Sequence, residues 1–354
     1  MRSVLGVRLD SAGDVLLMGP AVRAIAHGAD RVDLLVSPRG SEAAALLPGV
    51  TDVIEFDAPW AAVPAVAFES HRLTALVDQL AARSYDEAVV FTSYHQSPLP
   101  TALLAKLAGV PLVAASCDDY PGSLVDVRHR RSSDGSDDDG TDRGGHEVAA
   151  ALDLAAAAGY RLPAGDDARL QLREPLPSVP AHLPDQPYVV VHPGAAASAR
   201  GIGASRGSAI VAALADDGWP VVVTGGAGEQ EAAHEVADSG GGNLAGRTTL
   251  AELAAVLRGA AAVVVGNTGP AHLAAAVGTP VVSLFAPVVP AARWEPWKVP
   301  LVLLGDQQAA CAGTRARDCQ VPGHPCLSQV SPTDVVAAVR SLTGTSRRLG
   351  RRAS

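Results

Sequence analysis

Short apolar runs alternate with amphipathic segments along most of this 354-residue chain. In the first half, apolar runs predict buried strands at residues 3–9, 31–36, 52–56, 88–91 and 112–115. Apolar residues at helical spacing predict helices near residues 14–26, 41–47, 69–82 and 99–108. Because strands that alternate with helices are typical of a parallel sheet covered on both faces, the first half is predicted to be a doubly wound α/β domain.

The second half repeats this alternation after an irregular middle region. Residues 128–145 carry a run of Ser, Asp and Gly and predict a mobile acidic loop, and residues 146–158 predict a helix. The proline-rich stretch 161–187 is interpreted as a linker. Beyond it, strands are expected at residues 188–191, 220–223, 261–266 and 281–284, with helices at 206–216, at 249–258 and from Pro270 onward.

The pattern predicts the domain organisation of the whole chain. Residues 1–160 form the first domain and residues 188–330 the second, on either side of the linker at 161–187. Residues 331–354 are expected to be a C-terminal helix followed by a basic, disordered tail. The predicted class is α/β, with two Rossmann-like parallel-sheet domains.

Three strands of the second half end in turns rich in glycine. The sequence His192-Pro193-Gly194-Ala195 follows the first, Thr224-Gly225-Gly226-Ala227-Gly228-Glu229 the second, and Asn267-Thr268-Gly269-Pro270 the third. Carboxyl ends of parallel strands meet at one edge of a sheet, so the three turns are expected to converge. Backbone N–H groups of residues 268–271 at a helix N-terminus favour an anion, and Gly269 leaves room for it.

This convergence predicts a phosphate-bearing ligand in the second domain. Any one of these turns by itself is an ordinary strand-to-helix connection, and His272 in that case is a structural histidine. The fingerprints of two common phosphate sites are missing from the sequence: there is no Gly-x-Gly-x-x-Gly after the first strand and no Gly-x-x-x-x-Gly-Lys-Ser/Thr. A ligand in one half and a carboxylate in the other suit group transfer across a cleft.

Composition narrows the range of partners. Hydrophobic residues make up 48% of the chain and aromatic residues 4%, so the cores are built from Ala, Val and Leu. The net charge of −9 argues against nucleic acid as a partner. No apolar run reaches the roughly 18–20 residues of a membrane span, and the N-terminus lacks the layout of a signal peptide. We therefore expect a cytoplasmic protein, at most peripheral at the inner membrane face.

Several of these segments together resemble glycosyltransferase family 9, whose best-known members are ADP-heptose:lipopolysaccharide heptosyltransferases. The resemblance rests on four motifs in order: Val7-Arg8-Leu9-Asp10-Ser11-Ala12-Gly13-Asp14-Val15-Leu16, Val191-His192-Pro193-Gly194-Ala195, Thr224-Gly225-Gly226-Ala227-Gly228-Glu229 and Asn267-Thr268-Gly269-Pro270-Ala271-His272. It implies the GT-B fold, with two Rossmann-like domains facing across a cleft. It also implies a metal-independent, inverting transfer of a sugar from a nucleotide-sugar donor, possibly ADP-heptose, to a glycan or glycolipid, without a cofactor.

The resemblance assigns roles to particular residues. Asp14 corresponds to the catalytic base, and Ser11 and Gly13 lie beside it on the acceptor side. The donor is implied to bind at the three turns of the second domain, through His192, Gly194, Arg200, Thr224, Gly225, Glu229, Asn267, Thr268, Gly269, Pro270 and His272. Glu229 would hold the ribose hydroxyls, and Arg200 stands where the family usually carries a Lys-Arg-Trp-like segment.

Three alternatives remain at this point. Asp14 at the start of a helix is equally interpreted as a helix cap. A nucleotide-sugar epimerase shares the two-domain architecture, and a non-catalytic sugar-nucleotide-binding protein would also keep these turns. Cys311, Cys319 and Cys326, with His324 nearby, are interpreted as inert thiols rather than a zinc site, because their spacing is unusual for one.

Overall fold

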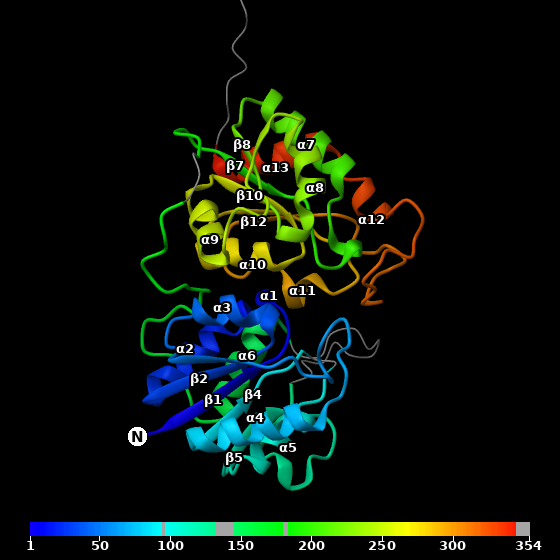
Figure 1. The fold of residues 1–354 in the computed structure, drawn as a ribbon. Coiled ribbons are helices and arrows are strands. Elements are labelled where there is room, and N and C mark those ends of the chain that lie inside the picture. The colour runs from blue at the N-terminus through cyan, green and yellow to red at the C-terminus, as the bar shows by residue number, and fades with distance from the viewer. Residues whose placement is uncertain (94–95, 132–144, 180–182, 345–354) are drawn as a thin grey trace, which may run out of the picture. The chain divides into compact units, whose positions relative to one another are not determined.

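A computed structural model describes residues 1–93, 96–131, 145–179 and 183–344 (Figure 1). The chain divides into two compact units. The first contains Met1–Pro175 together with Ala292–Trp297, and the second contains Leu176–Ala291 together with Lys298–Ser354. The short segment Ala292–Trp297 therefore belongs to the first unit although the residues on both sides of it belong to the second.

The first unit is built on a parallel sheet of six strands in the order β3-β2-β1-β4-β5-β6. The strands are β1 (Ser3–Arg8), β2 (Arg31–Val36), β3 (Asp52–Glu55), β4 (Glu87–Val90), β5 (Leu112–Ser116) and β6 (Val127–His129). The helices are α1 (Ala12–Leu17), α2 (Gly19–Gly28), α3 (Ser41–Ala45), α4 (Ser70–Arg83), α5 (Leu99–Leu107) and α6 (Glu147–Ala157), joined by part of α11 (Ala291–Trp294).

The second unit repeats this plan with the strand order β12-β11-β10-β7-β8-β9, again parallel throughout. Its strands are β7 (Val189–His192), β8 (Val221–Val223), β9 (Gly241–Asn243), β10 (Ala262–Gly266), β11 (Val281–Leu284) and β12 (Leu301–Leu304). Its helices are α7 (Ala204–Asp216), α8 (Gln230–Ala237), α9 (Leu250–Gly259), α10 (Gly269–Ala276), α12 (Pro325–Ser328) and α13 (Pro332–Thr343).

Aliphatic residues fill both cores, as the composition predicts. In the first unit, Leu76 and Leu80 of α4 pack with α5 against one face of the sheet. In the second, α7, α8 and α13 cover the face that carries Val189 and Val264. The strands are apolar on both faces because helices cover both. The predicted α/β class with two Rossmann-like sheets is confirmed.

The order of strands fixes where ligands can bind in each unit. In the first sheet the chain leaves β1 toward β2 on one side and returns to β4 on the other. In the second sheet β7 and β10 are the corresponding neighbours. Ligands of doubly wound sheets bind beyond the carboxyl ends of the strands at this point of reversal. The motif residues of both units follow these strand ends.

Three predicted boundaries differ from the structure. The helix expected at 14–26 is two helices divided at Met18, since Pro20 has no N–H to continue the first. Of the predicted linker at 161–187, the part up to Pro175 belongs to the first unit, where Asp166 is paired with Arg23 at 2.8 Å. The predicted loop at 128–145 begins with the end of strand β6, and residues 132–144 lie outside the described residues.

The structure also contains elements that the apolar pattern did not predict. They include the edge strands β6, β9 and β12 and the helices α8, α11 and α12. The C-terminal helix is α13, whereas the basic tail at 345–354 lies outside the described residues. Within the described residues, no helix combines the length and the apolar character needed to cross a membrane.

Candidate functional site

The three glycine-rich turns of the second unit lie on adjacent strands, as predicted. Strands β10, β7 and β8 are neighbours, and His192 at the end of β7 pairs in register with Val265 of β10. Nδ1 of His192 lies 3.0 Å from Oγ1 of Thr224, which directly follows β8. Nε2 of His192 lies 3.6 Å from a carboxylate oxygen of Glu229. Burial lowers the pKa of His192 despite the nearby carboxylate, so this imidazole is neutral at pH 7.

Glycine at position 194 lets the carboxylate of Glu229 lie against the turn after β7. A Cβ built on Gly194 would overlap the Glu229 carboxyl group. Glu229 is oriented by a hydrogen bond of 2.7 Å from the N–H of Gly226 to Oε2. Gly225 is also closely packed, since a Cβ added to it would lie 3.2 Å from Ala245 and 3.3 Å from Glu229. The structure therefore brings His192, Gly194, Thr224, Gly225 and Glu229 into one group.

A second close approach joins Arg200 to the third turn. A Cβ on Gly266, the last residue of β10, would overlap the backbone carbonyl of Arg200, so this position requires glycine. The side chain of Asn267 is buried, and it exchanges two hydrogen bonds with the backbone of Ala286, at 3.2 and 3.1 Å. Asn267 is predicted to bind the donor, and its amide joins the ends of β10 and β11.

The helix N-terminus after β10 offers fewer donors than the sequence suggested. The N–H of Thr268 donates to Gly266 O at 2.9 Å, and that of Ala271 donates to Thr268 O at 3.0 Å. Pro270 has no N–H, so among residues 268–271 the N–H of Gly269 remains. The predicted anion site at residues 268–271 therefore rests on one backbone N–H rather than on several. His272, in the first turn of α10, is buried.

The first unit gathers charged groups beyond the end of β1. Arg8, the last residue of that strand, is buried, and its Nε lies 2.7 Å from Oδ2 of Asp10. Its Nη2 lies 3.3 Å from Oδ1 of Asp14 and donates to Ser93 Oγ at 3.0 Å. Burial opposes the charge of Arg8, but Asp10, Asp14 and Glu147 raise its pKa above the usual value. Arg8 is therefore a fixed cation between carboxylates.

The predicted base lies at the start of α1. Asp14 Oδ2 accepts hydrogen bonds from the hydroxyl of Ser11 at 2.7 Å and from the Ser11 N–H at 3.3 Å. Gly13 lies in the same first turn and is buried. The Asp14 side chain is 20% exposed and that of Asp10 is 11% exposed, so Asp14 is the more accessible. The cap and base interpretations of Asp14 both fit this geometry.

Glu147 joins the charged groups of the first unit and is 2% exposed. Its carboxylate lies 2.8 Å from Nη1 of Arg131, 3.5 Å from Nη2 of Arg8 and 3.8 Å from Nη1 of Arg293. Three arginines and three carboxylates, those of Asp10, Asp14 and Glu147, thus form a neutral cluster. A buried carboxylate needs such partners, because water no longer solvates it.

Segment Ala292–Trp297 is fixed to the first unit by the residue before Glu147. His146 caps α6: its Nδ1 accepts a hydrogen bond of 3.2 Å from the N–H of Val148. Its Nε2 donates to the carbonyl of Glu295 at 2.9 Å, and its ring lies 4.3 Å from that of Trp297, centre to centre. These contacts and the Arg293–Glu147 pair explain why this segment belongs to the first unit.

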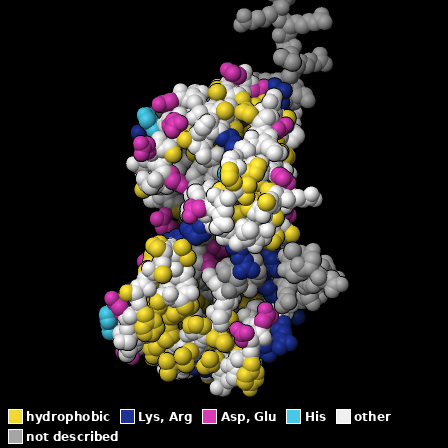
Figure 2. Space-filling view, turned by 90° about the vertical axis from the view of Figure 1, so that its right-hand side faces the viewer, with side chains coloured by type: hydrophobic (Ala, Val, Ile, Leu, Met, Phe, Trp, Pro, Cys, Tyr) yellow, Lys and Arg dark blue, Asp and Glu magenta, His cyan; other side chains and the backbone are white. Residues whose placement is uncertain are grey.

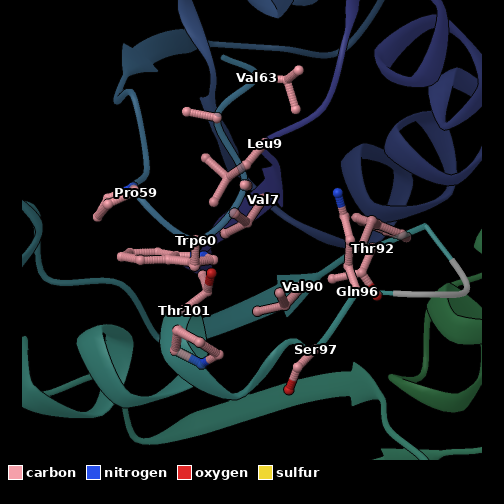
Figure 3. Close-up of a pocket in the computed structure, with 14 residues that line it drawn as sticks. Val7, Leu9, Pro59, Trp60, Val63, Val90, Thr92, Gln96, Ser97 and Thr101 are labelled. Atoms are coloured by element: carbon pink, nitrogen blue, oxygen red, sulfur yellow. The ribbon is translucent and has the colours of Figure 1, made fainter. Parts of the chain in front are cut away.

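A pocket of about 380 Å³ opens at the carboxyl ends of β1 and β4 in the first unit (Figure 3). Val7 and Leu9 come from β1 and its extension, and Val90 comes from β4. Trp60 lies on one side, with Thr92 and Gln96 on the opposite side. Gln96 Nε2 donates to Oδ1 of Asp10 at 2.5 Å, so the pocket borders the charged cluster.

Similarity to known proteins identifies the family of this chain. The family model described as glycosyltransferase family 9 (heptosyltransferase) matches residues 74–324, which is more than half of the chain. The chain belongs to glycosyltransferase family 9. The matched segment includes all three turns of the second unit and begins after Asp14.

One curated relative is lipopolysaccharide heptosyltransferase 3 of Escherichia coli, 33% identical over 174 residues. That alignment covers 46% of this family 9 chain and spans about half the length of the relative. Two solved structures share the fold over nearly the whole chain. E. coli ADP-heptose lps heptosyltransferase II has a TM-score of 0.73 at 19% identity and covers 97% of this chain and 98% of its own. The glycosyltransferase family 9 protein of Veillonella parvula has a TM-score of 0.71 at 15% identity and covers 97% of both.

A third solved structure shares the fold. It is the E. coli heptosyltransferase WaaC with ADP-2-deoxy-2-fluoro heptose, with a TM-score of 0.67 at 20% identity. It covers 96% of this chain and 99% of its own. These likenesses confirm the GT-B fold predicted from the family 9 motifs.

Three of the four cysteines of this family 9 chain, Cys311, Cys319 and Cys326, belong to the second unit. Cys311 and Cys326 are buried in the second core, and Cys319 packs at its border. Burial and the neighbouring thiol of Cys311 raise the pKa of Cys326 to about 11, which disfavours the reactive thiolate. Nε2 of His324 lies 3.1 Å from the carbonyl of Ala199. Among the described residues, no group of three or more His, Cys, Asp and Glu side chains is placed to hold a metal ion.

Sequence reasoning missed Glu147, Arg131 and the whole pocket. Arg8 gave a usable signal, because an arginine at the end of an apolar strand must find buried partners. The partner Glu147 gave none, since it follows the polar loop and begins an Ala-rich helix. Trp60 lies in a segment with neither strand nor helix periodicity.

Proposed function

We propose that this family 9 protein is an inverting glycosyltransferase. It transfers a sugar, with a heptose as the first candidate, from a nucleoside diphosphate to a hydroxyl group of a glycan or glycolipid. Two of the relatives described above are named as lipopolysaccharide heptosyltransferases, and the WaaC structure was determined with ADP-2-deoxy-2-fluoro heptose. The donor proposed for this chain is therefore a nucleotide-sugar of the ADP-heptose type.

The observation that carries this proposal is the convergence of motif residues in the second unit. His192, Thr224 and Glu229 lie within hydrogen-bond or ion-pair distance along adjacent strand ends. Glu229 is held with its carboxylate beside the turn, where it is suited to accept hydrogen bonds from ribose hydroxyls. The first turn of α10 and Arg200 lie at the end of β10, where a diphosphate would be stabilised by the helix dipole and a cation.

In the proposed reaction Asp14 acts as the general base. The acceptor oxygen forms a bond to the anomeric carbon while its proton passes to the Asp14 carboxylate. The bond between the anomeric carbon and the diphosphate oxygen breaks, and the nucleoside diphosphate leaves with that electron pair. Attack from the face opposite the leaving group inverts the anomeric configuration. Ser11 orients the base through its two hydrogen bonds to Oδ2.

The leaving group is stabilised by fixed groups of the second unit. Negative charge develops on the diphosphate as the bond breaks, and an N–H and a cation in fixed positions favour that charge. We assign this part to the Gly269 N–H and to Arg200, and propose that neither a bound metal nor a cofactor is needed. A chelator such as EDTA is then expected to leave turnover unchanged. We further propose cytoplasmic action, with at most peripheral contact with the inner membrane face.

A screen of free nucleotides by thermal unfolding tests the donor assignment. A ligand at about 100 times its dissociation constant adds roughly 2.7 kcal/mol to the free energy of unfolding. ADP is expected to raise the melting temperature more than UDP or GDP. The matching nucleotide-sugar should then release nucleoside diphosphate only with an acceptor present. Isomerised sugar nucleotide in the absence of acceptor would indicate an epimerase instead, and no stabilisation by any nucleotide would contradict the donor site.

A further inference from the structure

The residues that line the pocket of the first unit indicate the chemical class of its ligand. Ten of its fourteen lining residues are apolar, among them Trp60, Val63, Val90 and Phe91. The other four, Thr92, Gln96, Ser97 and Thr101, carry neutral hydrogen-bonding groups. Its volume of about 380 Å³ lies in the usual range for small-molecule sites, roughly 300–1,000 Å³. This is the composition of a site for an uncharged ligand with both C–H surface and hydroxyl groups.

The position of the pocket ties it to the transfer reaction. It lies at the carboxyl ends of β1 and β4, where a doubly wound sheet binds its ligand. Gln96 borders it and donates to Asp10, and Asp10 and Asp14 share Arg8 as a partner. A molecule in the pocket is therefore bound close to the carboxylates at the end of β1. The donor motifs belong to the other unit, so this site suits the acceptor.

The charges of the cluster at the end of β1 are already matched to one another, and the guanidinium of Arg39 donates a hydrogen bond of 3.0 Å to the carbonyl of Val63 at the pocket. Arg8 is paired with Asp10, Asp14 and Glu147, and Arg131 is paired with Glu147. A phosphate or carboxylate entering the pocket would exchange water for apolar side chains and neutral hydroxyls. Burial of an ion in such surroundings is unfavourable without a paired charge. A neutral sugar ring has a smaller free-energy cost of desolvation. Its C–H groups can pack on the aromatic and aliphatic side chains, while its hydroxyls can form hydrogen bonds with Thr92, Ser97 and Thr101.

We propose that this pocket binds the acceptor through an uncharged sugar ring, and that it disfavours an anionic sugar at the same position. The assignment of the bound sugar as the acceptor rests on the proposed function. The preference of the pocket for an uncharged sugar ring does not. It gives the acceptor a chemical class that the names of the relatives do not.

Two probes that differ at a single substituent, neutral in one and anionic in the other, test the proposal. They are p-nitrophenyl glucoside and p-nitrophenyl glucuronide, in which a hydroxymethyl group is replaced by a carboxylate. Binding to the full-length protein is measured by ligand-observed NMR titration without donor, with galactoside and mannoside forms included. At least one neutral glycoside is expected to bind about tenfold more tightly than the glucuronide. Equal or tighter binding of the glucuronide, or no binding of any neutral glycoside, would overturn the proposal.

A pair of surface variants locates the binding. Val63 and Leu103 are both 45% exposed, but only Val63 lines the pocket. Figure 2 shows hydrophobic side chains gathered in patches on the face that it draws, so an exposed apolar residue is by itself no sign of a binding site. Val63→Arg is expected to weaken binding of the neutral glycoside and to reduce the difference in affinity between the glycoside and the glucuronide. Leu103→Arg is expected to change neither affinity. The same response in both variants would place the glycoside elsewhere.

Removal of the aromatic side chain gives an independent measurement. Trp60→Ala is expected to lower the affinity for the neutral glycoside about tenfold, because loss of a large buried contact usually has an effect of this size. The melting temperature of each variant shows whether it is folded, and stabilisation by nucleotide shows whether the second unit is intact. Glycoside binding without turnover of any donor would contradict the proposed function alone. Turnover that needs an anionic acceptor would contradict this inference alone.

Discussion

At the scale of single residues, the two units differ in how their buried ionisable side chains are stabilised. The first buries full charges and pairs them, as the four contacts of Arg8 with Asp10, Asp14, Ser93 and Glu147 illustrate. The second buries a neutral imidazole, because burial lowers the pKa of His192. A fixed pair of charges holds a carboxylate in one position, as the proposed proton transfer to Asp14 requires. A neutral ring beside Glu229 leaves that carboxylate available to neutral hydroxyls.

The Gly194→Ala substitution tests whether Glu229 belongs to the donor site. The new Cβ would overlap the carboxylate, and a flexible side chain can move away without unfolding the protein. We expect nucleotide affinity to fall about tenfold or more, with the melting temperature nearly unchanged. Gly228→Ala is the matched control, because a Cβ there meets nothing within 4 Å. Isothermal titration with ADP measures both; unchanged affinity in folded Gly194→Ala would remove Glu229 from the site.

The Glu147→Gln substitution tests the buried charge cluster. It keeps the shape of the side chain but leaves three arginines with one carboxylate fewer. Loss of one partner from a buried pair typically destabilises a protein by about 3–5 kcal/mol. We expect a loss of this order in the free energy of unfolding from urea titration. Glu69→Gln provides the control: its nearest ion-pair partner is His71 at 3.7 Å and it is exposed, so about 0–1 kcal/mol is expected. A loss below 1 kcal/mol for Glu147→Gln would show that the cluster relaxes.

At the scale of elements, the sequence predicted the interior strands well and the edges poorly. β1, β7 and β10 are apolar on both faces, so their runs stand out. β9 is Gly241-Gly242-Asn243, which carries no strand signal, and β6 contains Arg128 and His129. Their pairing is decided by the neighbouring strand rather than by their own residues. β12 is an apolar run that the pattern could have revealed.

The cap of α6 makes a prediction about pH. Burial lowers the pKa of His146, whereas in the unfolded chain a histidine has a pKa of about 6.5. The unfolded state therefore binds more protons as the pH falls through that value, so the folded state loses stability from pH 7.5 to pH 5.5. His129, His192 and His324 act in the same direction, since burial lowers the pKa of each.

The His146→Asn substitution isolates the contribution of this cap. Asparagine also caps helices, so the cap is retained while the titrating group is removed. We expect the difference in unfolding free energy between pH 7.5 and pH 5.5 to become smaller than in the wild type. Exposed His71 supplies the comparison, and His71→Asn should leave that difference unchanged. Equal pH dependence in wild type and His146→Asn would mean that His146 titrates alike in the folded and unfolded states.

At the scale of the whole molecule, the sequence located one site more fully than the other. The predicted donor residues of the second unit follow apolar strands that are adjacent in the sheet, so strand topology alone brings His192 and Thr224 together. The first site is assembled from distant parts: Arg8, Glu147 and Arg293 are brought together by α6 and by the segment Ala292–Trp297. Only Asp14 and its neighbours could be read in the sequence, because side-chain pairing over such separations leaves no local pattern.

Separate sites in separate units predict that catalysis and donor binding can be lost independently. Asp14→Asn keeps the shape of the side chain and its capping ability but removes the proton acceptor. We expect release of nucleoside diphosphate, with donor and acceptor present, to slow by about 10²–10⁴. The affinity for the nucleotide should stay unchanged, because its proposed site lies in the second unit.

Asp10→Asn is the necessary comparison, since Asp10 is a second carboxylate beside Arg8. Burial raises the pKa of Asp10, and its oxygens already accept from Gln96 and Ser93 while Arg8 lies at 2.7 Å. We expect a smaller loss of turnover than for Asp14→Asn, accompanied by lower stability because Arg8 loses a charged partner. Loss of turnover in Asp10→Asn alone would move the base to Asp10. Turnover near that of the wild type in both variants would leave Asp14 as a helix cap and contradict the proposed mechanism.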